Sequence, residues 1–347
     1  MHVKSVSENP LSSYNRRDFL KLSGAGLAAW LLSPIVNAVS QGHLTLGRIL
    51  EQNVRLYQSP DFGSKVTGVY WKDDIVNITS ATVGGDEPAH NRVWYKIEEK
   101  GYVHSGVVQP VLTQLNEPVV ELPEVGALAE VTVPFTDALW GPGKTNRFAY
   151  RYYYETTYWI DGLVYDSNGE PWYRIQEDKW DLILYTPAEH LRVILPEELT
   201  PISPEIPLEA KRLEVQTANQ LVLAYEYDKP VFAARAATGA IFSNGRYLTP
   251  AGRHQTFHKR PSRHMAAGNL TANGYDLPGV PWVTYFTKSG IAIHGTYWHN
   301  DYGKPRSHGC VNVNSQAAKW IYLWTLPYVP YTEQRVYENF GTTLDVI

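Results

Sequence analysis

The sequence contains a single cysteine, Cys310, among its 347 residues. No internal disulfide can form in such a chain, so each domain has to be held together by packing alone. The sequence also has no excess of positive charge, because its 31 Lys and Arg residues are outnumbered by 35 Asp and Glu residues, which gives a net charge of −4. Proteins that bind nucleic acid normally carry a basic surface, so the composition gives no support to that class of partner.

The amino terminus carries paired arginines in Asn-Arg-Arg-Asp-Phe-Leu-Lys at 15–21, followed by an apolar run at 22–36. This pattern resembles a twin-arginine export signal. The run is shorter than the roughly 20 residues that span a bilayer, and no cysteine is present to take a lipid anchor. We therefore expect residues 1–38 to be a signal cleaved after Ala38, which places the mature chain in the cell wall or the extracytoplasmic space. An uncleaved membrane anchor is the alternative.

The region after the signal is predicted to form short strands separated by turns, which makes the chain mainly β. Residues 45–112 resemble a bacterial SH3-type β-barrel, and the strand Val-Trp-Tyr-Lys-Ile at 93–97 belongs to its expected hairpin. Trp-Tyr-Arg-Ile at 172–175 repeats the Trp-Tyr-Lys-Ile of the first segment 78 residues later. We therefore predict a second, diverged barrel at 125–195. A β-rich spacer is the alternative for the first segment.

The prolines at 196–210 predict a linker, and a further β domain is expected at 211–347. The pattern at 315–324 predicts the only helix near the carboxyl end, capped by Asn314 or Ser315. Cys310 is therefore expected on a strand or loop just before that helix.

Cys310 lies in Ser-His-Gly-Cys-Val-Asn at 307–312, sixteen residues after the His294 of Ile-His-Gly-Thr at 293–296. A lone thiol near imidazoles is typical of a nucleophile and its base. A free thiol has a pKa of about 8.5 and is mostly protonated at neutral pH, so we expect His294 to take its proton and form an ion pair that favours thiolate. The alternative is a buried cysteine that serves only in packing.

These two motifs, together with Thr-Pro-Ala-Gly at 249–252, resemble the L,D-transpeptidase catalytic domain in order and spacing. The resemblance implies a β-sandwich with a short helix, a catalytic Cys310, a basic His294, and a Gly295 carbonyl that orients this histidine. It also implies an enzyme that acts on peptidoglycan tetrapeptide stems through a thioester and forms cross-links with an acceptor amine, and the amino-terminal signal predicts its export. Carbapenem-type inhibitors are expected to acylate the cysteine.

The resemblance and the chemistry assign further roles around Cys310. The peptide N–H groups of His308, Gly309 and Cys310 are expected to stabilise the oxyanion. Substrate contacts are expected from Ser307, Asn312 and Tyr285. The alternatives are that Ser307 and the His308 ring hold the loop, that Asn312 positions it, and that Tyr285 is a core residue.

A segment from His254 to Asp276 is expected to cover the site as a lid, with Gly268, Asn273 and Gly274 in a mobile loop. The spacing of His254 and His258 would suit zinc on a helix, but neighbouring prolines and the missing glutamate disfavour this. We expect neither a metal nor a cofactor. An L,D-carboxypeptidase and a non-catalytic wall-binding protein are the alternative functions.

Overall fold

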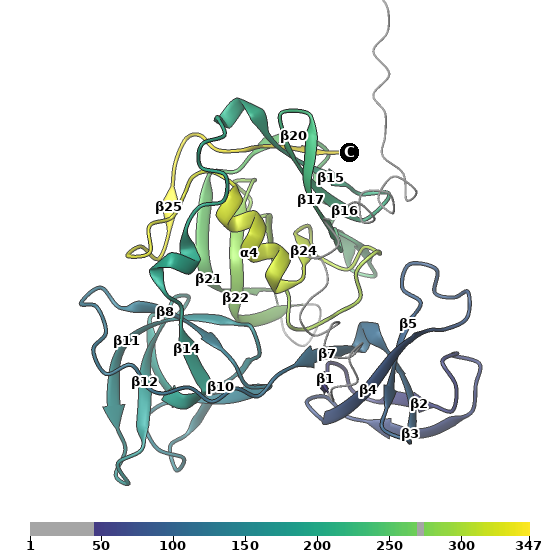
Figure 1. The fold of residues 1–347 in the computed structure, drawn as a ribbon, viewed down its shortest axis with the longest axis horizontal. Helices are drawn as coiled ribbons and strands as arrows, with labels where there is room; N and C mark the ends of the chain where they lie inside the picture. The colour runs from purple at the N-terminus through teal and green to yellow at the C-terminus, as the bar shows by residue number, and fades with distance from the viewer. Residues whose placement is uncertain (1–44, 269–273) are drawn as a thin grey trace, which may run out of the picture.

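The computed structural model describes residues 45–268 and 274–347. The predicted export signal, its cleavage site and Asn273 of the predicted lid lie outside the described residues. Two β domains lie below a third domain that contains α4 (Figure 1). Within the described residues, no helix has the length and apolar character needed to cross a membrane.

The first β domain is an antiparallel sheet with the strand order β3-β2-β6-β5-β4-β1-β7. The apolar residues of its strands alternate with exposed ones and point into a common core. The strands are β1 (Thr45–Ile49), β2 (Val54–Tyr57), β3 (Val66–Tyr70), β4 (Ile75–Val83), β5 (Val93–Ile97), β6 (Gly101–His104) and β7 (Val108–Val111), with a short 3-10 turn η2 (Ser105–Val107) before β7.

The second β domain has the order β10-β9-β13-β12-β11-β8-β14, which is the order of the first domain position for position. Trp94 and Trp172 are each the second residue of corresponding strands, β5 and β12, and both are buried. The sequence repeat therefore coincides with a repeat of topology, whereas the SH3-type assignment stays a prediction. The strands are β8 (Ala127–Val131), β9 (Phe135–Leu139), β10 (Phe148–Tyr153), β11 (Thr157–Tyr165), β12 (Pro171–Glu177), β13 (Leu182–Pro187) and β14 (Leu191–Val193), with a 3-10 turn η3 (Ala188–His190).

The carboxyl-terminal domain consists of two five-stranded sheets, ordered β17-β16-β15-β26-β20 and β24-β23-β22-β21-β25. Two 3-10 turns precede it, η4 (Pro196–Leu199) and η5 (Leu208–Ala210), in the segment predicted as a linker. The strands are β15 (Lys211–Gln216), β16 (Leu221–Glu226), β17 (Lys229–Arg235), β20 (Gly252–Gln255), β21 (His258–Ala267), β22 (Tyr275–Tyr285), β23 (Ala292–Gly295), β24 (Val311–Val313), β25 (Val336–Tyr337) and β26 (Thr343–Val346), and a small hairpin is formed by β18 (Ile241–Phe242) and β19 (Gly245–Arg246).

The predicted helix is α4 (Ser315–Trp324), and the Asn314 side chain accepts a hydrogen bond from the N–H of Ala317 at its first turn. Its apolar face packs into a core that both five-stranded sheets share. Leu128, Trp159 and Ile194 of the second β domain belong to the same core. Because this apolar contact is continuous, the second β domain and the carboxyl-terminal domain form one packed unit.

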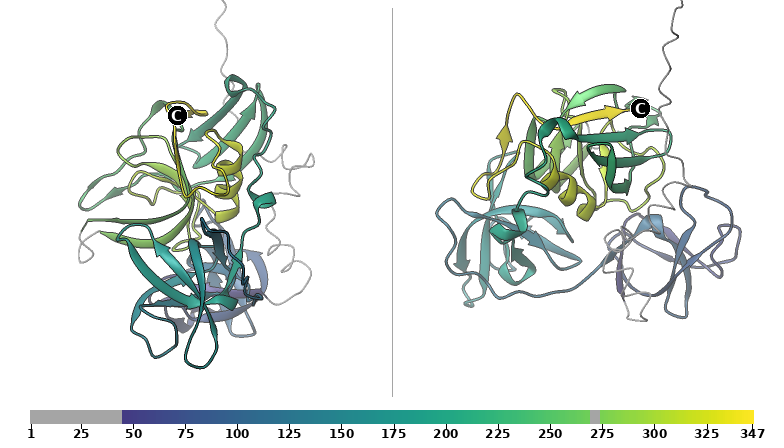
Figure 2. Two further views of the ribbon diagram at one scale, coloured as in Figure 1. Left: turned by 90° about the vertical axis from the view of Figure 1, so that its left-hand side faces the viewer. Right: turned by 45° about the horizontal axis from the view of Figure 1, so that its top comes forward.

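Both β domains contact the carboxyl-terminal domain through polar side chains as well. The first β domain meets the loop between β23 and β24, and the second meets β21 and β22. The right-hand view of Figure 2 shows that the two β domains lie on either side beneath the carboxyl-terminal sheets. The candidate site is therefore set within a three-domain assembly.

Candidate active site

His294 and Cys310 are brought together by two parallel neighbouring strands. His294 lies in β23, and the strand pairs in register with β24, so that His294 is opposite Asn312. Cys310 immediately precedes β24 and is half-buried. The sequence prediction that the cysteine lies just before the helix is confirmed, since α4 begins five residues later.

The His294 ring is held by the main chain of the next residue. Its Nδ1 lies 2.9 Å from the carbonyl oxygen of Gly295, which is the contact that the resemblance implies. A carbonyl oxygen can only accept, so Nδ1 carries the proton and Nε2 has the free lone pair. Because the side chain is only 2 % exposed, desolvation lowers the pKa of His294 to about 4. The imidazole is therefore neutral at pH 7 and able to accept a proton.

The pKa of the Cys310 thiol is shifted in the opposite direction, upward. Desolvation raises its pKa to about 11, and a backbone hydrogen bond from Ala292 offsets only part of this effect. Thiol and imidazole are both neutral at pH 7 in this state. The structure thus differs from the ion pair expected from the sequence, because burial penalises both charged forms.

The loop before Cys310 is fixed by a chain of hydroxyl groups. Ser307 Oγ donates to the carbonyl oxygen of Cys310 at 2.5 Å and accepts the N–H of Gly309 at 3.1 Å. Thr249 Oγ1 donates to the carbonyl oxygen of Gly309 at 2.8 Å and accepts the N–H of Gly239 at 2.9 Å. The Ser307 side chain therefore holds the loop, and the expectation that it contacts substrate is not supported.

This hydroxyl contact also changes the predicted oxyanion site. The N–H of Gly309 is engaged by Ser307 in this state, whereas the sequence prediction counted it among three donors. Gly309 has a φ of 112°, and a Cβ at this position would lie 3.1 Å from the Cδ1 of Ile291. Glycine is required here, because other residues would be strained in this conformation and would crowd the neighbouring strand.

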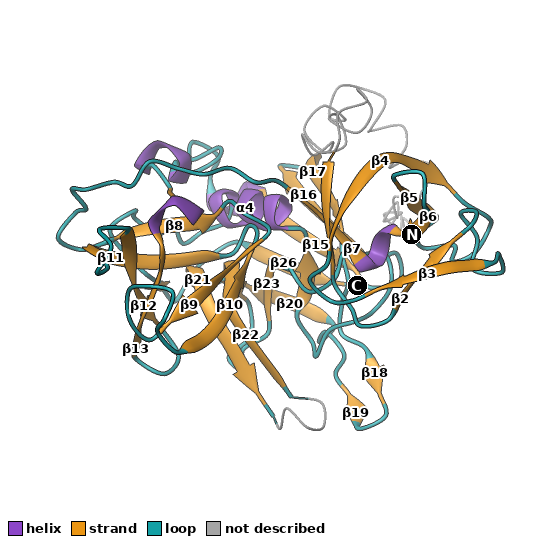
Figure 3. Cartoon of the chain, turned by 90° about the horizontal axis from the view of Figure 1, so that it is seen from below, coloured by secondary structure: helices purple, strands orange, loops and turns teal. Residues whose placement is uncertain are grey.

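The His308 ring packs among aromatic side chains of two hairpins. It stacks on Phe242 at a centroid distance of 4.5 Å and meets the edge of Tyr247 at 4.7 Å, while Tyr275 lies 5.7 Å away. Phe242 belongs to β18, and Tyr275 begins β22. Figure 3 shows the β18–β19 hairpin and the far end of β21–β22 projecting on one side of the molecule. The His308 side chain thus ties the cysteine loop to both hairpins.

Tyr285 and the predicted lid are placed on strands. Tyr285 is half-buried at the end of β22, pairs with Ala292 of β23, and stacks on His258 at 4.8 Å. The described part of the segment expected to form a mobile lid is largely β21, together with the last two residues of β20. β21 pairs along β22, and β20 pairs with β26. The Pro261 carbonyl of β21 also accepts a hydrogen bond from Thr157 of the second β domain.

Asn312 lies in the interior, and its prediction as a substrate contact needs correction. Its side chain is 2 % exposed, and its Nδ2 lies 3.0 Å from Nε2 of His299, which is also buried. The main chain of Asn312 exchanges two hydrogen bonds with Ala237, at 2.8 and 3.0 Å. These contacts agree with the alternative role in positioning the loop.

Two residues near the site have contacts that the sequence analysis does not predict. The Trp298 ring lies against His294, with centroids 5.8 Å apart. The only available signal was its position, four residues after the histidine. The buried Thr249 belongs to the Thr-Pro-Ala-Gly motif, but the motif does not predict that its hydroxyl group links Gly239 to Gly309 of the cysteine loop. Among residues 45–268 and 274–347, no group of three or more His, Cys, Asp or Glu side chains is placed to hold a metal ion.

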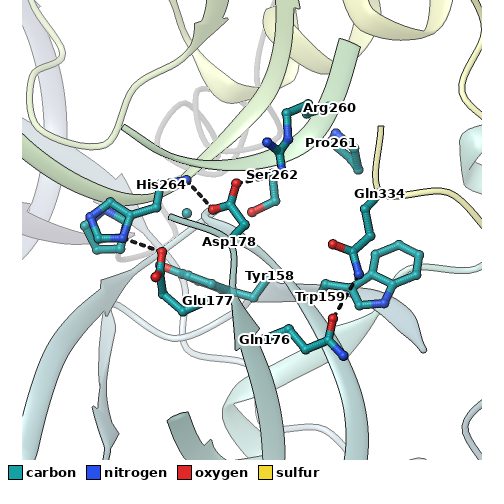
Figure 4. Close-up of a pocket in the computed structure, with 12 residues that line it drawn as sticks. Tyr158, Trp159, Gln176, Glu177, Asp178, Arg260, Pro261, Ser262, His264 and Gln334 are labelled. Atoms are coloured by element: carbon teal, nitrogen blue, oxygen red, sulfur yellow. Dashed lines mark hydrogen bonds and ion pairs between the residues drawn. The ribbon is translucent and has the colours of Figure 1, made fainter. Parts of the chain in front are cut away.

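A separate pocket lies between the second β domain and β21–β22 (Figure 4). It contains none of the predicted catalytic residues. His264 bridges Glu177 of the second β domain, at 2.5 Å, and Asp276 of β22. Burial alone would lower the pKa of His264, but these two carboxylates raise it above its usual value. Arg263 adds an ion pair to Asp178 at 2.6 Å, so the pocket is a charged junction between domains.

The chain is similar to solved L,D-transpeptidase structures. One from Xylanimonas cellulosilytica is 24 % identical, with 40 % of this chain and 60 % of that chain covered and a TM-score of 0.29. A mutant from Enterococcus faecium is 21 % identical over 40 % and 50 %, with a TM-score of 0.31. L,D-transpeptidase 3 from Mycobacterium tuberculosis, with a faropenem-derived adduct, is 16 % identical over 48 % and 73 %, with a TM-score of 0.32. This chain thus covers less than two thirds of the length of the X. cellulosilytica and E. faecium proteins.

No curated protein matches the sequence. A family model described as the YkuD L,D-transpeptidase catalytic domain matches residues 210–336. The match includes Thr249, His294 and Cys310, and it leaves both β domains outside. Residues 210–336 therefore form a YkuD L,D-transpeptidase catalytic domain, preceded by two small β domains.

Proposed function

We propose that this protein is an exported cysteine L,D-transpeptidase that acts on peptidoglycan tetrapeptide stems. The observation that carries the proposal is the family match over a domain in which His294 lies on β23 and Cys310 immediately precedes the neighbouring strand β24. The proton on Nδ1 is held by Gly295, so Nε2 is the atom that remains for acid–base work. The two β domains do not supply a second catalytic cysteine, since the sequence has only one.

The first half-reaction forms a thioester. Nε2 of His294 takes the proton of the Cys310 thiol as its sulfur attacks the carbonyl carbon before the terminal D-alanine. The peptide N–H groups of His308 and Cys310 are the proposed donors to the oxyanion, because the N–H of Gly309 is engaged by Ser307. When the intermediate collapses, the C–N bond breaks, and the proton on His294 passes to the leaving amine of D-alanine.

The second half-reaction releases the enzyme. His294 takes a proton from an acceptor amine as its nitrogen attacks the thioester carbonyl, and the Cys310 sulfur leaves as a thiol after receiving that proton. An amine from a neighbouring stem gives a cross-link. Water in the same position would give L,D-carboxypeptidase activity, which uses the same residues.

The experiment uses a purified tetrapeptide stem with and without an amine-bearing second stem, and mass spectrometry follows the products. We expect release of D-alanine and a cross-linked dimer from the parent protein, and neither product from Cys310→Ala. D-alanine release without a dimer would assign the carboxypeptidase reaction. Binding of isolated peptidoglycan with no turnover by the parent would contradict the enzymatic proposal and support the wall-binding alternative.

Two further parts of the proposal rest on the sequence and the family. Export by the twin-arginine route rests on the arginine pair at 16–17 and the apolar run that follows it. A mature chain that begins at Val39 in the extracytoplasmic fraction would support it, and intact mass measures this directly. Acylation by carbapenems is proposed for Cys310, since the structure of another L,D-transpeptidase, LdtMt1, was solved in complex with the carbapenem imipenem.

A further inference from the structure

The segment that joins the two proposed catalytic residues is bound by the first β domain. This segment, the connector, comprises residues 296–306 between His294 and the cysteine loop. Asn300 Nδ2 donates to the carbonyl oxygens of Ser105 and Val108 at 3.3 and 3.0 Å. Asp301 accepts from Nε2 of His90 at 2.9 Å. The connector therefore packs on a domain that the family match does not include.

The deepest of these contacts is made by Arg48 of β1, whose side chain is only 1 % exposed. Its Nη2 donates to the carbonyl oxygen of Tyr297 at 2.5 Å and to Oε1 of Gln109 at 2.8 Å. Its Nη1 donates to Oδ1 of Asp73 at 2.9 Å. The guanidinium lies over the ring of Tyr153 at 4.0 Å. One planar group thus joins the first β domain, the second β domain and the connector.

A buried arginine is a costly way to stabilise a fold, since desolvation of the charge opposes its ion pairs. Arg48 has one close acidic partner, and its Nε has no partner within the described residues. Its two remaining hydrogen bonds go to neutral oxygens. The planar fork of guanidinium suits this arrangement, because it presents donors in one plane to acceptors on different sides, whereas an ammonium group is a compact point charge.

The contact at Tyr297 is close to the proposed base. β23 ends at Gly295, so the chain leaves the sheet within two residues of Tyr297. The Tyr297 ring stacks on Tyr153 at 5.1 Å, and the next residue, Trp298, lies against the ring of His294. The carbonyl of Tyr297 belongs to the peptide group that it shares with Trp298, so a shift there would displace the Trp298 ring from the His294 ring. The packing of the imidazole therefore depends on the contact between Arg48 and Tyr297.

We propose that Arg48 of the first β domain is a positioning residue for His294. It fixes the connector at Tyr297, and through the Trp298 ring it holds Nε2 at the orientation needed to take the thiol proton. The inference rests on the proposed function, because it assigns His294 as the base. It also makes the first β domain a part of the catalytic unit, in addition to any role in binding the wall.

The test compares two conservative variants in the full chain. Arg48→Lys keeps the positive charge beside Asp73 but cannot bridge Tyr297, Gln109 and Asp73 together. Arg151→Lys is the matched control, since Arg151 also contacts Asp73, at 3.3 Å, but does not contact the connector. Imipenem is the probe, and intact mass follows acylation of the single cysteine over a range of imipenem concentrations. Thermal unfolding is measured for each protein.

For Arg48→Lys we expect the limiting acylation rate to fall at least about tenfold, because misplacement of a catalytic group by an ångström costs up to about a hundredfold. The imipenem concentration for half-maximal rate should be unchanged. Arg151→Lys should stay within about twofold of the parent. A rate for Arg48→Lys within twofold of the parent, or an equal loss in Arg151→Lys at similar stability, would overturn the proposal.

A second variant covers the case in which Arg48→Lys does not fold. Asn300→Ala removes the connector contacts to Ser105 and Val108 from the other side, and we expect it to slow acylation about threefold with unchanged half-maximal concentration. An unchanged rate in a folded Asn300→Ala would count against anchoring by the first β domain. If the parent itself is not acylated, the proposed function fails, whereas an acylated parent with insensitive variants refutes only the positioning role.

Discussion

The reactivity of Cys310 should rise steeply with pH between 7 and 10. With a pKa of about 11, the thiolate fraction is on the order of 10⁻⁴ at pH 7 and on the order of 10⁻¹ at pH 10. A free cysteine with a pKa of about 8.5 would be roughly 3 % thiolate at pH 7. Cys310 should therefore react about two orders of magnitude more slowly than a free thiol at neutral pH. Its rate should increase about tenfold per pH unit.

The assay is alkylation with iodoacetamide, followed by intact mass. The sequence has one cysteine, so the mass shift reports Cys310 without interference from another thiol. The same chain unfolded in guanidinium chloride is the control, and its rate should follow the profile of an ordinary cysteine. A rate for the folded protein that is already maximal at pH 6–7 would contradict the raised pKa of Cys310. It would show that the thiolate–imidazolium pair expected from the sequence exists at rest.

Four other predictions follow from individual contacts. His294→Gln should lower the rate of carbapenem acylation by about 10²–10⁴-fold while circular dichroism stays unchanged. Gly309→Ala should lower the thermal midpoint and slow acylation, because alanine is strained at a φ of 112°. Lys259→Ala should reduce the free energy of unfolding in urea by about 3 kcal/mol, because the buried amino group, whose pKa burial holds well below its usual value, donates to two carbonyl oxygens at the end of α4. The His264 pKa is raised in the folded protein, so protonation of this residue contributes stability that is fully present below pH 6.5 and is lost as the pH rises through the folded pKa. The free energy of unfolding in urea should therefore fall over this pH range for the parent protein and should not show this fall for His264→Gln.

The local features of the fold could be predicted from the sequence. Apolar spacing and capping chemistry predict the helix at 315–324 with a cap at Asn314 or Ser315, and the structure has the helix with Asn314 as its cap. The repeated Trp-Tyr pair predicted a second β domain, and the two domains have the same strand order. These predictions succeed because each depends on residues close together in the chain.

The contacts between distant segments could not be predicted in the same way. Arg48 and Tyr297 are 249 positions apart, and no local sequence pattern at either residue predicts their hydrogen bond. The neutral state of the thiol and imidazole depends on burial, which a motif does not specify. The engagement of Gly309 by Ser307 likewise depends on the path of one short loop. The roles assigned to the residues around Cys310 therefore changed more than the identity of the site itself.

The most direct measurement is the intact mass of the protein after exposure to a carbapenem. We expect one adduct per chain on the parent protein and none on Cys310→Ala, with unfolding curves that show both proteins to be folded. No adduct on the folded parent protein, or an adduct that persists in Cys310→Ala, would contradict the assignment of Cys310 as the nucleophile.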